Sequence, residues 1–186
     1  MRFWIALIVL FSNNIWSQKT TDAYIAKWKD ECVHQMLEHG IPASITMAQG
    51  ILESGSGTSD LAIQANNHFG IKCGSEWTGK SFLKDDDKKD ECFRVYAHAK
   101  ASFEDHSLFL KKSRYESLFA LQLTDYKGWA HGLKKCGYAT NPKYPQLLIE
   151  LIEKHKLYEL DKYNQNSSSE LKKKDREELS SLEIKE

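Results

Sequence analysis

A single glutamate, Glu53, stands at the end of an apolar-periodic segment and directly before a turn rich in glycine and serine, in the run "SITMAQGILESGSGTS". An acid held between a packed helix and an open turn can be partly buried, and partial burial raises a carboxyl pKa. A raised pKa suits a general acid, which protonates a leaving group near neutral pH. The alternative is a solvated residue at a helix end, where the helix dipole mildly disfavours a negative charge.

A second group of acids follows in "KDDDKKDEC", whose members are Asp85, Asp86, Asp87, Asp90 and Glu91. For most of them the simplest interpretation is a solvated hairpin tip. Glycoside hydrolysis, however, uses two carboxylates, one to protonate the leaving oxygen and one to activate water or to attack carbon. Side chains alternate along a strand, so Phe82, Lys84 and Asp86 share a face. If that face turns to a groove, Asp86 is the candidate partner of Glu53.

Two further segments carry groups suited to sugars. In "KKCGYATNPKYP", Tyr138 and Thr140 follow a helix-ending glycine, and a tyrosine displayed there can hydrogen-bond a reacting centre or contact a sugar ring. A tyrosine that only packs the loop is the alternative. Tyr144 of the same segment is a further candidate for substrate binding. In "NNHFG", Asn67 and Phe69 offer an amide and an aromatic ring for glycan hydroxyl and N-acetyl groups.

Other chemistries lack their sequence signatures. The chain has no GxSxG elbow, HExxH helix, P-loop or GxGxxG motif, and its seven histidines do not have metal-ligand spacing. We therefore expect no metal and no cofactor. The formal net charge of zero at pH 7 gives no indication of a nucleic-acid partner.

The elements that must position these residues are mostly helical. Helical periodicity and end signals predict helices from residue 22 to the Gly40–Pro42 stop, from 42 or 43 to 53, from 58 or 59 onward, and over 99–111, 115–119, 126–135 and 144–156. Between residues 66 and 96 this periodicity stops, and "HFGIKC", "KSFLKD" and "CFRVY" are typical of short strands. The expected fold class is α+β, a mainly helical domain with a small β-hairpin lobe. The expected core includes Phe103, Leu108, Phe109, Leu118, Leu147, Leu148, Leu151 and Ile152.

Both ends of the chain differ from the middle, and we expect one domain over residues 20–160. Residues 1–17 resemble an export signal, with Arg2, the apolar run "FWIALIVLF" and a polar exit, which predicts cleavage between Ser17 and Gln18. The apolar run is too short to span a bilayer, so we expect no stable membrane anchor and a protein in the periplasm or outside the cell. Residues 161–186 are charged and serine-rich, which favours a disordered tail with transient helix near 170–182.

Export would give the four cysteines a role. In an oxidising compartment Cys32, Cys73, Cys92 and Cys136 can form two disulfides, with three pairings possible. We favour Cys73–Cys92, which would close one local excursion and contribute roughly 3 kcal/mol, together with Cys32–Cys136. Free buried thiols are the alternative.

Taken together, these motifs resemble the N-acetylglucosaminidases of glycoside hydrolase family 73, a group that includes flagellar-type peptidoglycan hydrolases, bacterial autolysins and mannosyl-glycoprotein endo-beta-N-acetylglucosaminidase-like domains. The resemblance covers about residues 24–158. It is carried by "IPASITMAQGILESGSGTS", "NNHFGIKC", "WTGKS", "CFRVYAHAKASFEDHSLFL", "RYESLF" and "WAHGLKKCGYATNPKYPQLLIELI". The "DDD" hairpin and "ECFR" are most similar to exported forms from Bacteroidetes-type bacteria.

The resemblance implies a lysozyme-like fold with a substrate groove between a helical lobe and a β lobe. It implies a protein that binds peptidoglycan glycan strands and hydrolyses the β-1,4 bond after N-acetylglucosamine. We expect this protein to be a monomer. Glu53 matches the general acid, and Tyr138 matches the tyrosine of the "YAT" motif, although Asn141 stands where many members have Asp. The second carboxylate is Asp86, a neighbour, or none, in which case the substrate's own N-acetyl group is the nucleophile.

The alternatives to this function are a lytic transglycosylase, which also uses one Glu, and a non-catalytic glycan-binding module. An amidase is disfavoured because the sequence shows no zinc or Cys–His site.

Overall fold

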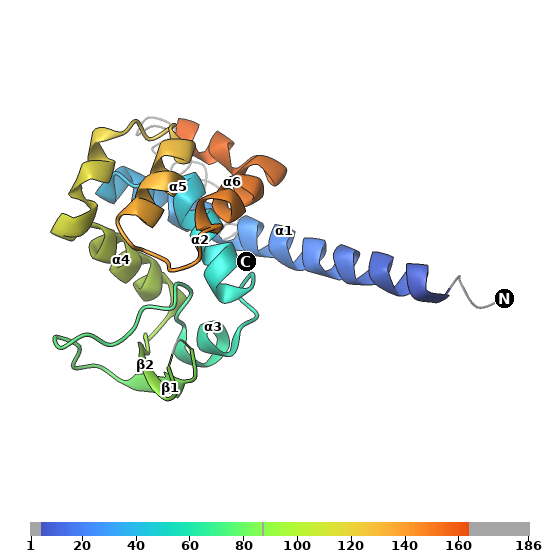
Figure 1. Ribbon diagram of the computed structural model, residues 1–186, viewed down its shortest axis with the longest axis horizontal. Coiled ribbons are helices and arrows are strands. Elements are labelled where there is room, and N and C mark those ends of the chain that lie inside the picture. Colours follow the sequence, from blue (N-terminus) through green and yellow to red (C-terminus); the bar gives the residue numbers. More distant parts are fainter. Residues whose placement is uncertain (1–4, 87, 164–186) are drawn as a thin grey trace, which may run out of the picture.

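The computed structural model describes residues 5–86 and 88–163, with residues 5–17 described by their backbone alone. It is a mainly helical domain with a two-stranded sheet at one end (Figure 1). The α+β class expected from the sequence is therefore confirmed. The elements are α1 (Ile5–His39), α2 (Ala43–Ser54), α3 (Asp60–Ala65), β1 (Ser81–Lys84), β2 (Glu91–Arg94), α4 (Ala99–Leu110), η1 (Ser113–Ala120), α5 (Tyr126–Lys135), α6 (Tyr144–Lys154) and η2 (Leu157–Lys162), where η denotes a 3₁₀ helix.

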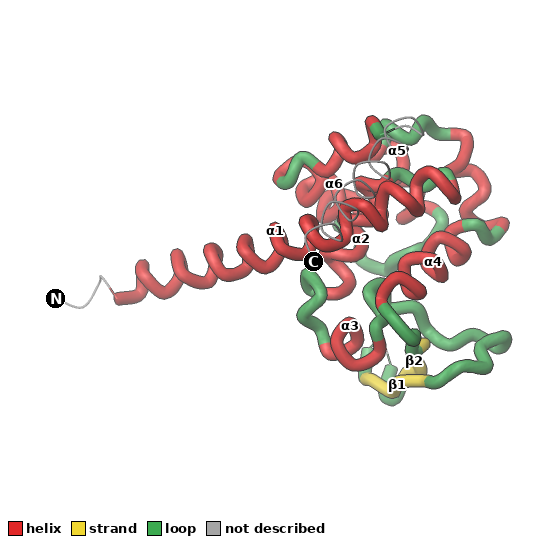
Figure 2. Tube along the Cα trace, turned by 180° about the vertical axis from the view of Figure 1, so that it is seen from behind, coloured by secondary structure: helices red, strands yellow, loops and turns green. Residues whose placement is uncertain are grey.

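Helix α1 begins well before the expected start at Asp22. It runs without interruption from Ile5 to His39, and its first half extends away from the domain (Figures 1 and 2). The reason is local: this stretch contains neither glycine nor proline, the residues that break helices. The predicted signal peptide lies partly outside the described residues, and its removal stays a prediction. In the described part of the chain, no helix combines the length and apolar character needed to cross a membrane.

Helix α2 occupies the centre of the domain. It contacts α1, α5, α6 and η2, and ten of its twelve residues are buried. It ends at Gly55, whose φ of 56° lies in the left-handed region that glycine adopts without strain. The sequence-based bounds of this helix are confirmed to within a residue. Because α2 is enclosed on several sides, its last turn is held in a fixed place.

The start of α2 is capped from a distant part of the chain. Its N-cap residue, Pro42, makes no side-chain hydrogen bond. Instead, the Asp161 carboxylate accepts hydrogen bonds from the Ser44 backbone N–H at 2.8 Å and from the Ser44 hydroxyl at 2.6 Å. Asp161 is only 6% exposed, so it belongs to the domain and not to the tail that composition assigned to residues 161–186. The tail beyond residue 163 lies outside the described residues.

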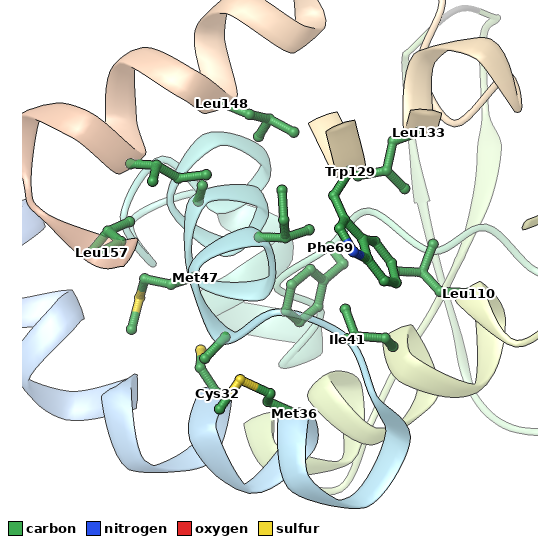
Figure 3. Close-up of a cluster of buried hydrophobic side chains, with 14 of the residues drawn as sticks. Cys32, Met36, Ile41, Met47, Phe69, Leu110, Trp129, Leu133, Leu148 and Leu157 are labelled. Carbon is green, nitrogen blue, oxygen red and sulfur yellow. The ribbon is translucent and has the colours of Figure 1, made fainter. Parts of the chain in front are cut away.

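The core lies between α2 and the surrounding helices (Figure 3). Of the expected core residues, Phe103, Leu118, Leu148 and Ile152 are at most 2% exposed. Leu108 is wrong, because it is 51% exposed. The buried face of α4 is formed by residues at helical spacing, and Leu108 falls outside it. These residues are Ser102, Phe103, His106, Ser107 and Leu110.

Residues 66–96, here called the β lobe, hold one antiparallel pair, β1 and β2, with Phe82 opposite Phe93. The predicted strand in "HFGIKC" is wrong, since it makes only one isolated bridge, from Lys72 to Phe93. The Asn67 side chain explains this difference: it bonds the backbone N–H and C=O of Ile71 and so bends the segment into a turn.

One of the two expected disulfides is present. Cys73 and Cys92 are bonded, with their Cα atoms 5.4 Å apart, so the loop before β1 is tied to β2. The pairing of Cys32 with Cys136 is wrong, because both are free thiols. Cys32 lies in the core next to Met36 on the buried stripe of α1 (Figure 3). Cys136 follows the last residue of α5 and lies beside Ser117. Helical packing, not a crosslink, places these two residues.

Candidate active site

A groove of about 580 Å³ lies between the helical part of the domain and the β lobe. Its helical wall includes the end of α2, the start of α6 and the loop between α5 and α6, and its other wall includes residues around β1 and β2. Six of the seven residues selected from the sequence for catalysis or substrate binding line it: Glu53, Phe69, Asp86, Tyr138, Thr140 and Tyr144. Its volume is in the range of sites that bind ligands of moderate size.

Glu53 sits in the last turn of α2, where it lines the groove and is exposed to it. The Tyr144 hydroxyl donates a hydrogen bond to Glu53 Oε1 at 2.9 Å. The pKa of Glu53 is raised above its ordinary value by burial, with a further increase from the charge of Asp86, and the Tyr144 hydrogen bond opposes this rise. A carboxyl in this environment keeps its proton to a higher pH than one surrounded by bulk water, which is what proton donation requires.

Two residues that the sequence analysis missed stand behind this pair. The amide nitrogen of Gln49 donates to the Tyr144 hydroxyl at 3.0 Å, and the amide oxygen of Gln49 lies 3.1 Å from His106 Nε2. Both residues are fully buried. Gln49 precedes Glu53 by four residues, so helical spacing could have indicated that both point to the same side of α2. His106 lies on α4, and nothing near it in the sequence marks it.

Tyr138 is placed by two cationic side chains that hold the backbone around it. Arg114 donates to the carbonyls of Cys136 at 2.6 Å and Gly137 at 2.9 Å. Lys134 Nζ donates to the carbonyls of Ala139 at 3.0 Å and Thr140 at 2.6 Å. The Tyr138 ring stacks on Tyr144, with centroids 5.7 Å apart. Burial raises the pKa of Tyr138, so its hydroxyl stays protonated at neutral pH and can act as a donor.

Asp86 reaches the groove from the turn after β1. It is half exposed and forms an ion pair with Lys72, whose Nζ lies 3.0 Å from Asp86 Oδ2 and 2.7 Å from Glu91 Oε2. The neighbouring Asp85 instead accepts a hydrogen bond from the Asp90 backbone N–H at 2.8 Å, inside the hairpin turn. Asp87 lies outside the described residues. Of the described hairpin acids, Asp86 is the one that lines the groove.

The structure assigns Asn67 a different place from the one expected. It is 1% exposed, does not line the groove, and its amide nitrogen donates to the carbonyls of Ile71 at 3.0 Å and Arg94 at 2.9 Å. Its polar atoms are therefore committed to the backbone of the β lobe, and the expectation that it binds substrate is corrected. Phe69 is 4% exposed and stacks on His106 with centroids 4.0 Å apart, while Thr140 is exposed.

Metal ligands are not gathered in the part of the chain that the structure describes, where no cluster of three or more His, Cys, Asp or Glu side chains could hold an ion. The expectation that no cofactor takes part stays a prediction. The functional groups of the groove are carboxyl, hydroxyl, amide and ammonium groups.

Known proteins are similar to this chain in sequence and in structure. Residues 29–157 match the glucosaminidase family model, described as mannosyl-glycoprotein endo-beta-N-acetylglucosaminidase. The chain is 36% identical to the exo-glucosaminidase LytG of Bacillus subtilis over 145 residues, which are 70% of this chain and 50% of LytG. It is 31% identical to the peptidoglycan hydrolase FlgJ of Vibrio parahaemolyticus over 127 residues, which are 62% of this chain and 41% of FlgJ.

A solved structure is also similar. The catalytic domain of the autolysin Auto from Listeria monocytogenes superposes with a TM-score of 0.66 at 25% identity, covering 76% of this chain and 87% of that domain. The chain spans half or less of the length of the two curated relatives, LytG and FlgJ.

Proposed function

The chain belongs to the glucosaminidase family, glycoside hydrolase family 73, and has its lysozyme-like fold; from this premise we propose that it hydrolyses the β-1,4 bond after N-acetylglucosamine in peptidoglycan, with Glu53 as general acid. One observation carries the proposal. Glu53 lines the groove and is open to it, desolvation raises its pKa, and one of its oxygens is held by Tyr144. A carboxyl that has a raised pKa, is oriented and is open to a ligand has the properties of a proton donor to a glycosidic oxygen.

In the proposed reaction, Glu53 transfers its proton to the glycosidic oxygen as the bond from that oxygen to the anomeric carbon breaks. The leaving sugar departs with a new hydroxyl. A water oxygen finally becomes bonded to the anomeric carbon, and the proton that this water releases returns to a carboxylate.

Attack at the anomeric carbon has two candidate sources. One is Asp86, which lines the other wall of the groove and is held there by Lys72. The other is the N-acetyl group of the substrate itself. Tyr138, protonated and stacked beside Tyr144, is suited to orient the water or the intermediate. The Asp86→Asn variant separates the two, since only the first route needs its carboxylate.

We also propose that the protein is exported and acts as a monomer in the cell wall. The support for export is the composition of residues 1–17, with its positive start, short apolar run and small residue at position 17. N-terminal sequencing of the protein recovered from the periplasm or medium tests this. A mature chain that begins at Gln18 is expected, and a chain that keeps residues 1–17 would contradict it.

The central experiment compares Glu53→Gln with Glu104→Gln on purified peptidoglycan. Glu104 is also an acid with hydrogen-bonding partners, Gln35 and His39, but it lies outside the groove. The Glu53 variant should lose about 10²–10⁴-fold in rate, the usual contribution of a general acid, while its circular dichroism spectrum stays native. The Glu104 variant should remain active. Near-normal release of reducing sugars by the Glu53 variant would refute the assignment.

The products identify the reaction. Mass spectrometry of the digested muropeptides should show reducing N-acetylglucosamine ends. Ends of the 1,6-anhydromuramyl type would instead indicate a lytic transglycosylase. Glycan binding without any clearing of a peptidoglycan zymogram would indicate a non-catalytic module.

A further inference from the structure

We propose that His106, a residue that does not reach the groove, is a positioning residue for the reaction: acting through Gln49, it sets the Tyr144 hydroxyl as a donor to Glu53. The inference deepens the proposed function and rests on Glu53 being the general acid. We call the chain of contacts from His106 through Gln49 to Tyr144 the relay. Its three members come from α4, α2 and α6, and none is more than 3% exposed.

The hydrogen bonds of the relay all run in one direction, from His106 to Glu53, because Gln49 and Tyr144 each accept one hydrogen bond and donate one. Gln49 presents its amide nitrogen to the Tyr144 oxygen and its amide oxygen to His106 Nε2. The Tyr144 oxygen thus accepts from Gln49, and its own O–H is left to donate to Glu53. If the Gln49 amide turned over, its oxygen would face Tyr144, and the Tyr144 O–H would point at Gln49 instead.

His106 decides which way the amide lies. Burial lowers the pKa of His106 to about 3, so the ring is neutral at the pH of the reaction and carries one N–H. With that hydrogen on Nε2, the ring donates to the Gln49 oxygen. With it on Nδ1, the ring would accept from the Gln49 nitrogen and the relay would reverse.

Two features favour the hydrogen on Nε2. His106 Nδ1 has no hydrogen-bond partner among the described residues, and a buried N–H without a partner is rarer in proteins than a buried acceptor without one. The resulting series of donors also ends on a carboxyl group, where a hydrogen bond to the ionised form is strong.

The ring of His106 is itself held in place. It stacks on Phe69 with an interplanar angle of 17°, and the Tyr138 ring meets it at a centroid distance of 6.1 Å. Among the residues that the structure describes, no charged side chain contributes to the pKa of His106, which burial lowers. Packing therefore fixes the position of the His106 ring. Through Gln49, that position sets the direction of the hydrogen bond from Tyr144 to Glu53.

The consequence for Glu53 follows from the groups around it. Those that face it are Tyr144 from α6, Tyr138 from the loop before α6 and Asp86 from the β lobe, with Lys72 and Lys84 also in the groove wall. The Tyr144 O–H is the contact that lowers the pKa of Glu53 against burial and Asp86. Without it, the pKa rises further. A general acid is inactivated as the pH rises through its pKa, so the alkaline limb of the rate profile would move to higher pH, with a lower kcat because the carboxyl is no longer oriented.

The first test follows the Glu53 carboxyl by carbon-13 NMR titration, alongside the pH profile of kcat/KM on peptidoglycan. His106→Phe keeps a ring to stack on Phe69 and removes the N–H, and it should raise the Glu53 midpoint by about one pH unit, the scale of one hydrogen bond to a charged group. His106→Gln keeps an N–H at the end of the side chain and should return the Glu53 midpoint most of the way to its value in the unmodified protein. An unchanged Glu53 midpoint in His106→Phe overturns the proposal.

The matched control is His68→Phe. His68 is also a buried histidine, and burial lowers its pKa to about 4. Its ring also packs against a phenylalanine, in this case Phe103. Its hydrogen bond goes to the Tyr24 hydroxyl, away from the groove. This variant should leave the Glu53 midpoint unchanged; a shift equal to that of His106→Phe would mean that loss of any buried histidine suffices, and would overturn the specific role of His106.

Tyr144→Phe tests the route. If His106 acts only through Tyr144, adding His106→Phe to Tyr144→Phe gives no further shift, whereas additive shifts overturn the route. Should His106→Phe not fold, nitrogen-15 NMR of the unmodified protein decides: a neutral ring with hydrogen on Nε2 supports the relay, and hydrogen on Nδ1 overturns it. If the titration shifts as expected but Glu53→Gln stays active, the relay stands and the proposed catalytic role fails.

Discussion

Asp161→Asn should stabilise the protein at neutral pH and not in acid, because Asp161 caps the helix that carries Glu53 at a cost in buried charge. Its carboxylate accepts two hydrogen bonds from Ser44 at the start of α2, yet it is almost fully buried. Burial raises its pKa from 3.8 to about 6, and the hydrogen bonds from Ser44 only partly oppose this. An asparagine keeps an oxygen for the Ser44 N–H and cannot ionise.

The magnitude follows from linkage. The folded-state pKa of about 6 exceeds the unfolded value of 3.8, so the folded protein binds this proton more tightly than the unfolded chain. The free energy of unfolding therefore falls as the pH rises from about 4 to 6, and the full loss persists above 6. At about 1.4 kcal/mol per unit the limit is about 3 kcal/mol, of which about 2.5 kcal/mol develops between roughly pH 4 and pH 7.5.

The assay is urea unfolding of both proteins at several pH values, with thermal melts in parallel. The quantity of interest is the difference in the free energy of unfolding between Asp161→Asn and the unmodified protein. The titration of the buried His68 and His106 affects both proteins equally and therefore cancels in this difference. It should rise by about 2.5 kcal/mol from acid to neutral pH, or about 5–10 °C in Tm for a domain of this size. Asp30→Asn, at an exposed position on α1, should show a flat difference. A flat difference for Asp161→Asn, or one that falls with pH, would refute the reasoning.

Three further outcomes are expected. Asp86→Asn removes a charge that raises the pKa of Glu53, so the alkaline limb of the rate profile should move to lower pH, and an unchanged limb in a pH–rate series would contradict this. Cys73→Ser, or reduction of the Cys73–Cys92 disulfide, opens a loop with a sequence separation of 19 and should cost about 3 kcal/mol in urea unfolding; a cost near zero would not agree. Arg114→Gln releases the two backbone carbonyls that precede Tyr138 and should lower kcat by a larger factor than it raises KM. Steady-state kinetics measures both constants, and equal changes in the two would contradict this expectation.

Several parts of this description follow from local sequence. The bounds of α2, α4, α5 and α6 were predicted to within one or two residues because apolar spacing and end signals are encoded in neighbouring residues. The hairpin of β1 and β2 was predicted for the same reason. Where local signals failed, tertiary contacts were responsible. The amide group of Asn67 is suited to binding a glycan, but its nitrogen and oxygen are hydrogen-bonded to the backbone of the β lobe.

Pairings over long sequence separations were the least predictable. Cys32 and Cys136 were paired because four cysteines invite two bonds, whereas each lies where its own helix places it. Asp161 was assigned to the tail by composition, but it lies 117 residues after Ser44 and contacts it directly. Composition averages over a window and contains no information about which single residue of that window folds back.

The sequence by itself determined the candidate acid, Glu53, the element that carries it and the family to which its motifs point, since these depend on residues close together in the chain. Only the tertiary structure decided how that acid is prepared for chemistry. Glu53 on α2 is desolvated in the groove, receives a hydrogen bond from Tyr144 on α6 and feels the charge of Asp86 in the β lobe. His106 acts on it from a fourth segment, α4. The pKa and the orientation of a carboxyl are set by the groups that surround it in space, and folding alone brings those groups together.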